Sequence, residues 1–200
     1  MIRLRAEVGD WIVGTGSKRL KRRYGIGCFK LIYAMKVDEK LTFEQYSKDP
    51  RFEKKIPRYG RKEERGDNIY YKDKEGRWYI RPSYHYGREL KSKKVKLKSP
   101  KVWIRDLSGC CVLVSRHFFY FGREAVELPK EFRIIANAKD DDHGLSNYRS
   151  EKIPKEVAER FIEWLERKYE TKNGCIGVPC EFKRKYSKEF FEKKPILVPL

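Results

Sequence analysis

The sequence feature that most constrains the fold is an alternating apolar run, GCFKLIYAMKV, at residues 27–37. A period of two places alternate side chains on one face of a β-strand. The side chains on the apolar face belong to Phe29, Leu31, Tyr33, Met35 and Val37. Ile32 and Ala34 interrupt the polar face, so we expect both sides of this strand to be partly covered.

Shorter signals predict the neighbouring elements. Thr42 and Gln45 form a capping box, and Asp49-Pro50 ends the helix that follows after about two turns. RWYI would close a hairpin through KDKEGR. Further strands are expected in residues 9–14 and in FRII. GCCVLVS and FFYFG would form either two closely linked strands or one bent strand. The lysine-rich residues 91–101 are either a guarded edge strand or a basic arm.

An amphipathic helix is expected late in the chain, in IPKEVAERFIEWLERKYETKNG. Pro154 suits the first turn, and Gly174 would stop the helix. Its apolar stripe consists of Val157, Phe161, Trp164 and Leu165. We therefore expect one α+β domain over residues 1–174 and a basic, aromatic extension over 175–200.

The order of these elements predicts the fold class. Strands follow one another without the regular alternation with helices that βαβ units require, which argues against a dinucleotide-binding fold. We expect a small mixed or antiparallel β-barrel with a short helix and a C-terminal amphipathic helix.

The charge balance suggests a polyanionic partner. The 48 Lys and Arg against 29 Asp and Glu leave a net charge of +19, and nucleic acid is the leading candidate partner. The alternative is a lysine-rich solvated surface of the kind found in proteins from hot sources, which the single glutamine also fits. No apolar stretch approaches twenty residues and the N-terminus lacks a signal-peptide core, so a cytoplasmic protein without membrane contact is expected. The odd number of cysteines, five, favours reduced thiols.

The stretch GTGSKRLKRR allows several interpretations. Two glycines could cradle a nucleotide phosphate. Alternatively, Thr15 or Ser17 could be a nucleophile with Lys18 as its base. We favour a turn that starts a basic loop for sugar-phosphate contacts, while a merely solvated loop is the remaining possibility. The bases of that loop are Lys18, Arg19, Lys21, Arg22 and Arg23.

Two of the three histidines lie beside groups that could act with them. His85 is near Ser83 in sequence and would face Asp67 and Asn68 across the predicted hairpin, where it could hold a base edge or orient a water. His143 follows three aspartates, which could bind a divalent cation but more often form a solvated loop. We predict no metal and no cofactor.

Several segments in order resemble the second type of nucleotide-modification-associated domain. They are GDWIVGTGSK, KLIYAMKVDEKLTFEQYSKDPRF, GDNIYY, PSYH and VLVSRHFFYFG, within residues 9–129. A weaker, fold-level likeness is to PUA-like barrels. The resemblance implies association with modified nucleotides in DNA, by processing or by recognition. It draws attention to Asp10, Trp11, Gly14, Thr15, Gly16, Ser17, Asp67, Asn68, Trp78, Ser83, His85, Ser115 and Phe118. The stretch Ile80-Arg81-Pro82 departs from the more amide-rich segment expected there.

Together these observations predict a nucleic-acid-associated domain, with DNA favoured over RNA and the oligomeric state left open. A base pocket would be walled by the Gly14 turn, Trp11, Asp67-Asn68, Trp78 and His85, and the basic loop would supply affinity for the backbone. Gly16 and Ser83 are further candidate nucleic-acid-binding residues. One rival is an enzyme that uses Thr15 or Ser17 with Lys18, or Asp67 with His85. Another is a protein-interaction module.

Overall fold

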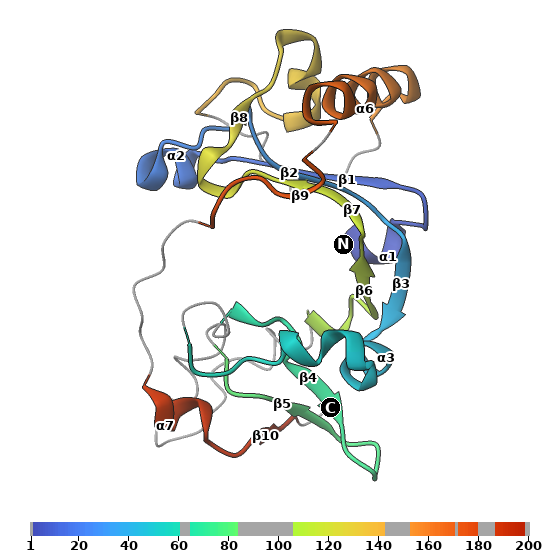
Figure 1. Cartoon of the computed structure of the whole chain (residues 1–200), viewed down its shortest axis with the longest axis vertical. Coiled ribbons are helices and arrows are strands. Elements are labelled where there is room, and N and C mark those ends of the chain that lie inside the picture. Colours follow the sequence, from blue (N-terminus) through green and yellow to red (C-terminus); the bar gives the residue numbers. More distant parts are fainter. Residues whose placement is uncertain are drawn as a thin grey trace. The chain divides into compact units, whose positions relative to one another are not determined.

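The computed structural model describes residues 2–60, 65–83, 106–142, 153–170, 172–179 and 187–198 (Figure 1). The chain divides into two compact units. Unit 1 comprises Met1–Lys40 and Leu113–Glu181, and unit 2 comprises Leu41–Val112 and Phe182–Leu200. His85, His143 and the lysine-rich residues 91–101 lie outside the described residues. The domain boundary expected at residue 174 stays a prediction.

Unit 1 is built on a sheet in which β1, β2, β7 and β9 follow one another and β8 also pairs with β2. All of these pairs are antiparallel except β7 with β9, which is parallel. The predicted run at residues 27–37 supplies the central strand, which confirms that prediction. The strands are β1 (Trp11–Thr15), β2 (Lys30–Lys36), β7 (His117–Tyr120), β8 (Val126–Glu127) and β9 (Gly174–Cys175).

The late helix of unit 1 covers one face of this sheet. Phe161 and Leu165 of α6 (Lys155–Tyr169) are buried with Leu31 of β2 and Phe119 of β7, as the predicted stripe requires. Figure 1 shows α6 on the same side of the sheet as the turns that follow β8. The smaller elements of unit 1 are α1 (Ile2–Arg5), α2 (Lys18–Tyr24), η3 (Gly122–Glu124) and η4 (Lys130–Ala136).

Two local predictions for unit 1 are wrong. FRII is not a strand but part of the 3₁₀ helix η4, which buries only Phe132 and leaves Ile134 exposed. Four apolar residues do not by themselves distinguish a strand from a helical turn. The basic stretch after Gly16 is not a loop but the helix α2. Lys, Arg and Leu are good helix formers, and the stretch is bracketed by Ser17 as N-cap and Gly25, with φ 72°, as C-cap.

Unit 2 packs short helices against a three-stranded sheet in the order β10–β5–β4. The expected capping box at Thr42 and Gln45 is present, and so is the hairpin through KDKEGR. The core buries Phe43, Ile69, Tyr70, Ile80, Phe190 and Val198. The elements are α3 (Phe43–Lys48), η1 (Pro50–Lys55), β4 (Tyr70–Lys72), β5 (Trp78–Ile80), α7 (Lys188–Phe191) and β10 (Ile196–Leu197).

A two-stranded ladder joins β3 (Glu39–Thr42) to β6 (Cys111–Val114), and the division between the units falls within both strands. GCCVLVS and FFYFG therefore supply separate strands, β6 and β7, with different partners. The described strands form three separate sheets in a mixed α+β protein, and closure into a barrel stays a prediction. In the described part of the chain, no helix combines the length and the apolar character that crossing a membrane requires.

Candidate nucleic-acid interface

The glycines of GTGSK are explained by close packing. A Cβ on Gly14 would overlap the ring of Tyr33, and a Cβ on Gly16 would overlap the backbone carbonyl oxygens of Ile26 and Gly27. The N–H of Gly16 donates to the Lys30 carbonyl at 2.9 Å. The N–H of Ser17 donates to the Ile26 carbonyl at 3.3 Å. Since these donors already have partners within the chain, the turn is poorly suited to cradle a phosphate.

Ser17 has a structural task that explains its position. Its hydroxyl oxygen accepts a hydrogen bond from the N–H of Leu20 at 3.2 Å and so caps α2. Thr15 lies at the end of β1, next to a register shift after Gly14. Lys18 is exposed on the first turn of α2. The use of Thr15 or Ser17 with Lys18 in catalysis stays a prediction.

The exposed bases of α2 share one face of the helix. Lys18, Arg19, Arg22 and Arg23 are all exposed. At 100° per residue, positions 18, 19, 22 and 23 fall within an arc of about 140°. Among the described residues, no carboxylate pairs with Arg19 or Arg22. We call these four residues the α2 basic face.

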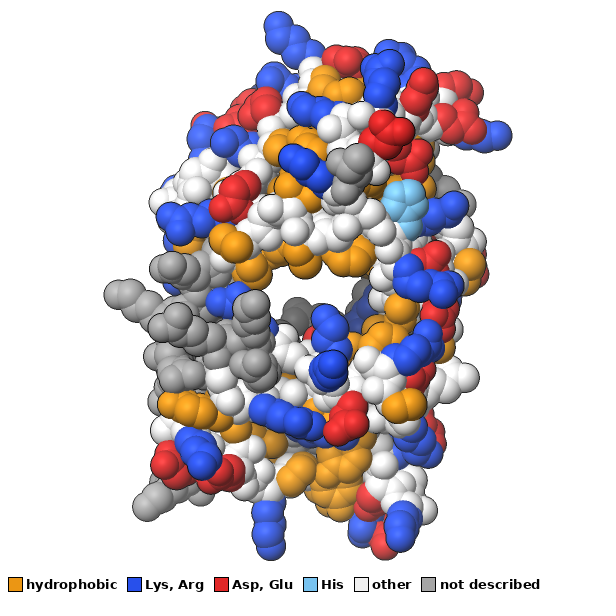
Figure 2. All heavy atoms as spheres, viewed as in Figure 1, with side chains coloured by type: hydrophobic (Ala, Val, Ile, Leu, Met, Phe, Trp, Pro, Cys, Tyr) orange, Lys and Arg blue, Asp and Glu red, His pale blue; other side chains and the backbone are white. Residues whose placement is uncertain are grey.

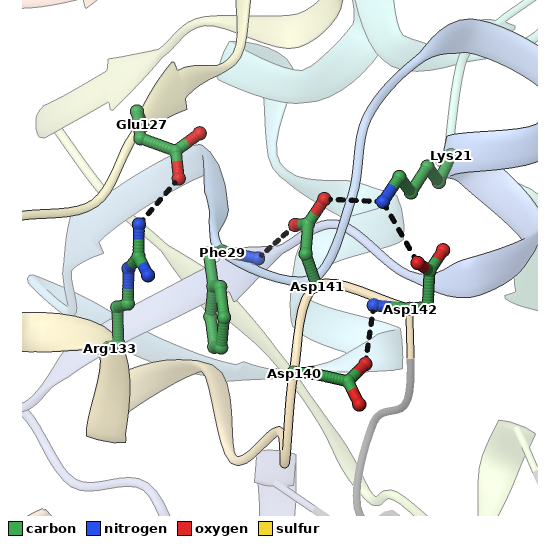
Figure 3. Close-up of polar contacts among 7 residues, drawn as sticks. All are labelled: Lys21, Phe29, Glu127, Arg133, Asp140, Asp141 and Asp142. Atoms are coloured by element: carbon green, nitrogen blue, oxygen red, sulfur yellow. Dashed lines mark hydrogen bonds and ion pairs between the residues drawn. The ribbon is translucent and has the colours of Figure 1, made fainter. Parts of the chain in front are cut away.

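Lys21 lies outside that arc and is held by two acids (Figure 3). Its Nζ is 2.8 Å from an Asp141 carboxylate oxygen and 3.1 Å from one of Asp142. Asp141 also accepts the N–H of Phe29 at 3.1 Å, which fastens residues 140–142 to the turn before β2. The hydrogen bond to Asp141 raises the pKa of Lys21, and the same bond is the main cause that lowers the pKa of Asp141. These ion pairs, which we call the Lys21 clasp, engage Lys21 although its side chain is still 36% exposed. The other four predicted bases make up the α2 basic face.

The clasp predicts a pH-dependent contribution to stability. A carboxyl group with a lowered pKa stabilises the fold above its unfolded pKa of about 3.9, and this contribution is lost as the pH falls through the folded value. We expect Asp141→Asn to lower the melting temperature most between pH 5 and pH 7, and we expect the difference from wild type to shrink as the pH falls below about 3.9. Thermal melts followed by circular dichroism measure this.

Asp142→Asn is the matched control for that substitution. The Asp142 side chain also contacts Lys21 but is 54% exposed, so we expect a smaller change in melting temperature. An Asp141→Asn melting curve that follows wild type across the whole pH range would contradict the role given to this carboxylate.

Trp11 packs inside unit 1 against the sheet. Its ring meets His117 edge-on at a centroid distance of 5.2 Å and stacks on Phe119 at 6.4 Å. The Nε2 atom of His117 is 3.6 Å from a carboxylate oxygen of Glu166. The other residues suggested by the resemblance also make local contacts. Asp10 accepts the N–H of Glu7, Ser115 donates its hydroxyl to the His117 carbonyl, and Phe118 donates its N–H to Asn173.

In unit 2, Asp67 and Asn68 hold neighbouring parts of the chain. The Tyr46 hydroxyl donates to Asp67 Oδ1 at 2.7 Å, and burial is the main cause that raises the pKa of Tyr46. Asn68 is buried, and its amide nitrogen donates to the Phe52 carbonyl at 3.3 Å. Arg81 Nη1 donates to both Asn68 oxygens at 3.1 Å. Proposed base contacts by Asn68 would have to exchange these bonds.

Arg81 is a residue that the sequence analysis noted only as a departure from the family pattern. Its guanidinium carbon lies 4.3 Å from the centre of the Tyr71 ring, and burial lowers its pKa. Two residues further on, Ser83 is buried, and its hydroxyl has no hydrogen-bond partner in the described part of the chain. An Arg directly after the aromatic strand β5 is the signal that could have drawn attention to this position.

Trp78 lines a cleft of about 370 Å³ in unit 2. The lining residues are Thr42, Phe43, Glu44, Lys72, Trp78, Leu107 and Cys110. Sequence reasoning singled out Trp78 but missed Glu44 and Lys72, because they come from α3 and β4 and carry no motif of their own. We call this the Trp78 cleft.

The structure thus gathers the predicted residues into two groups. Trp11, the glycine turn and the basic residues share one strand–turn–helix segment of unit 1, whereas Asp67, Asn68, Trp78 and Ser83 belong to unit 2. Their convergence on one base pocket stays a prediction, and His85 lies outside the described residues. Within the described part, no three His, Cys, Asp or Glu side chains gather as a metal ion would require.

These features define a strongly basic α+β protein with a capped cationic helix in one unit and an aromatic cleft in the other. The family model for nucleotide modification associated domain 2 matches residues 1–186. The chain belongs to this family, which confirms the resemblance and extends it beyond residues 9–129. No curated protein and no solved structure matches the chain.

Proposed function

We propose that the protein binds nucleic acid, with DNA favoured over RNA, and that the α2 basic face contacts the sugar-phosphate backbone. The observation that carries this proposal is the shared orientation of Lys18, Arg19, Arg22 and Arg23 on one exposed face of a helix capped at both ends. A base pocket in the same protein would add discrimination between nucleotides.

The chemistry of the α2 basic face suits phosphate. Three of its four residues are arginines, whose planar forks can donate two parallel hydrogen bonds to phosphate oxygens. Capping at Ser17 and Gly25 reduces the ordering that binding would otherwise require. A family associated with nucleotide modification gives such a face a natural polyanionic ligand.

Salt dependence tests this proposal directly. Four phosphate contacts predict a slope of about −3.6 when the logarithm of the association constant for duplex DNA is plotted against that of the salt concentration. Fluorescence anisotropy with a labelled duplex between 50 and 200 mM salt would show affinity falling on the order of 100-fold. The same titration with duplex RNA tests the preference for DNA.

A slope near zero, or no binding at low salt, would contradict the proposal and favour the protein-interaction module. A partner protein of modest acidity releases few counterions, so it would not reproduce the steep slope.

A further inference from the structure

The Trp78 cleft has the size and the walls of a site for one planar group. Its volume of about 370 Å³ lies at the low end of the range for small-molecule sites. Trp78 is half-buried, and its ring is held perpendicular to the Phe43 ring, at 89° and a centroid distance of 6.4 Å. Leu107 adds a second apolar wall. A rigid aromatic wall of this kind is suited to stacking against a flat ring.

The cleft also contains a positioned carboxylate. Glu44 Oε1 is 2.7 Å from Lys48 Nζ, and its Oε2 is 3.1 Å from Lys72 Nζ. The hydrogen bond from Lys48 is the main cause that lowers the pKa of Glu44. An ionised carboxylate accepts hydrogen bonds and donates none, and each oxygen has more than one lone pair. Glu44 can therefore accept N–H donors from a ligand while both lysines stay in place.

Lys72 connects the carboxylate to the aromatic wall. Its Nζ lies 5.1 Å from the centre of the Trp78 ring while it pairs with Glu44. The charged lining residues, Glu44 and Lys72, cancel in formal charge. A bare anion would be repelled by the Glu44 carboxylate. A purely apolar ligand would bury the Glu44–Lys72 pair without offering it hydrogen bonds. A neutral aromatic ring that carries N–H donors avoids both unfavourable effects.

We propose that the Trp78 cleft binds a single nucleobase that carries an exocyclic amine, stacked on Trp78 with the amine donating to Glu44. Carboxylates accept hydrogen bonds from such amines in base recognition. The choice of a nucleobase rests on the proposed nucleic-acid binding, which this site extends from the backbone to a base. The α2 basic face takes no part, so nucleosides without phosphate test the cleft separately.

Cys110 makes the cleft directly measurable. Its thiol is exposed and lines the cleft, while the exposed Cys175 lies in unit 1 and serves as an internal reference. Alkylation at each thiol, followed by mass spectrometry in a Cys180→Ser background, reports occupancy of the cleft. Two matched pairs of probes differ in the amine: deoxycytidine against deoxyuridine, and deoxyadenosine against deoxyinosine.

We expect deoxycytidine and deoxyadenosine to slow alkylation of Cys110 but not of Cys175. The two nucleosides of each pair differ by one hydrogen bond to a charged group. The concentration that halves the alkylation rate of Cys110 should therefore be about tenfold lower for the amine-bearing nucleoside than for the oxo nucleoside paired with it. In Glu44→Gln this preference should fall to about twofold or less, since an amide can donate to the oxo group as well as accept from the amine.

Two variants control the experiment. Glu53→Gln changes an exposed acid of η1 that pairs with Arg58 and does not line the cleft, so it should keep the preference. Trp78→Leu should weaken protection by all four nucleosides alike. If that variant does not fold, the Glu44→Gln comparison still decides.

Unprotected Cys110 at millimolar concentrations of all four nucleosides would overturn the inference, and so would an unchanged preference in Glu44→Gln. If either result came with a steep salt dependence of DNA binding, only the proposed base site in the Trp78 cleft would be contradicted, and the proposed role of the α2 basic face would stand. If Cys110 were protected but the protein did not bind DNA, the role of the α2 basic face would be contradicted and the base site would stand.

Discussion

Replacing both Arg19 and Arg22 with Gln is expected to weaken binding to duplex DNA on the order of 100-fold at low salt. The two arginines lie near the centre of the α2 basic face, and each charge-assisted contact with phosphate contributes roughly a factor of ten. The salt slope should fall from about −3.6 to about −1.8, because two of four contacts are removed. Gln is a good helix former, so α2 itself should persist.

Arg160→Gln with Arg167→Gln is the matched control in α6 of the same unit. It removes the same charge from exposed arginines on a helix, but those arginines stand among Glu159, Glu163 and Glu166. Figure 2 shows acidic and basic side chains interspersed over α6. We expect less than about a threefold change in affinity and an unchanged slope, since net charge alone contributes little. Equal losses in the two double variants would show that α2 has no special role.

Replacing Gly16 with Ala is expected to destabilise the fold by at least about 3 kcal/mol, at the upper end of overpacking effects. The added methyl group would overlap the carbonyl oxygens of Ile26 and Gly27, which are backbone atoms that cannot rotate away. Moving them apart would also disturb the bonds from Gly16 to Lys30 and from Ser17 to Ile26. Urea denaturation followed by circular dichroism measures the free energy of unfolding.

Gly25→Ala separates crowding from backbone strain. Gly25 has φ 72°, but nothing lies within 4 Å of the position that a Cβ would take. Only the left-handed conformation opposes this substitution, at a cost of about 1–2 kcal/mol. If Gly16→Ala proved no less stable than Gly25→Ala, the close approach of Gly16 to the carbonyl oxygens of Ile26 and Gly27 would be contradicted.

The parts of the fold that could be predicted from sequence depend on neighbours within a few residues. The Thr42 capping box, the KDKEGR hairpin and the α6 stripe are each complete within one segment, so pattern alone identifies them. The α2 helix carried equally local signals in Ser17 and Gly25, but the density of charge suggested a loop instead. The strand predicted in FRII was wrong for a different reason, because a stretch of four residues is too short to show the period of a strand or of a helix.

The candidate sites were less predictable than the elements that carry them. Sequence identified the basic residues of α2 and singled out Trp78, because charge clusters and isolated tryptophans are visible along the chain. It could not show that Lys21 is committed to Asp141 and Asp142, since Lys21 and Asp142 are 121 residues apart. Nor could it bring Glu44 and Lys72 to Trp78, since the three side chains come from separate elements.

The sequence by itself therefore determined the charge, the family, the α+β class and those elements whose caps and periodicity are local. Tertiary structure alone decided which strands pair, such as the parallel addition of β9 to β7, and which charges on α2 remain exposed. The physical reason is the separation along the chain of the residues that interact. Capping and amphipathicity act between residues a few positions apart, whereas strand pairing, clasps and clefts require segments far apart in the chain to be brought into contact.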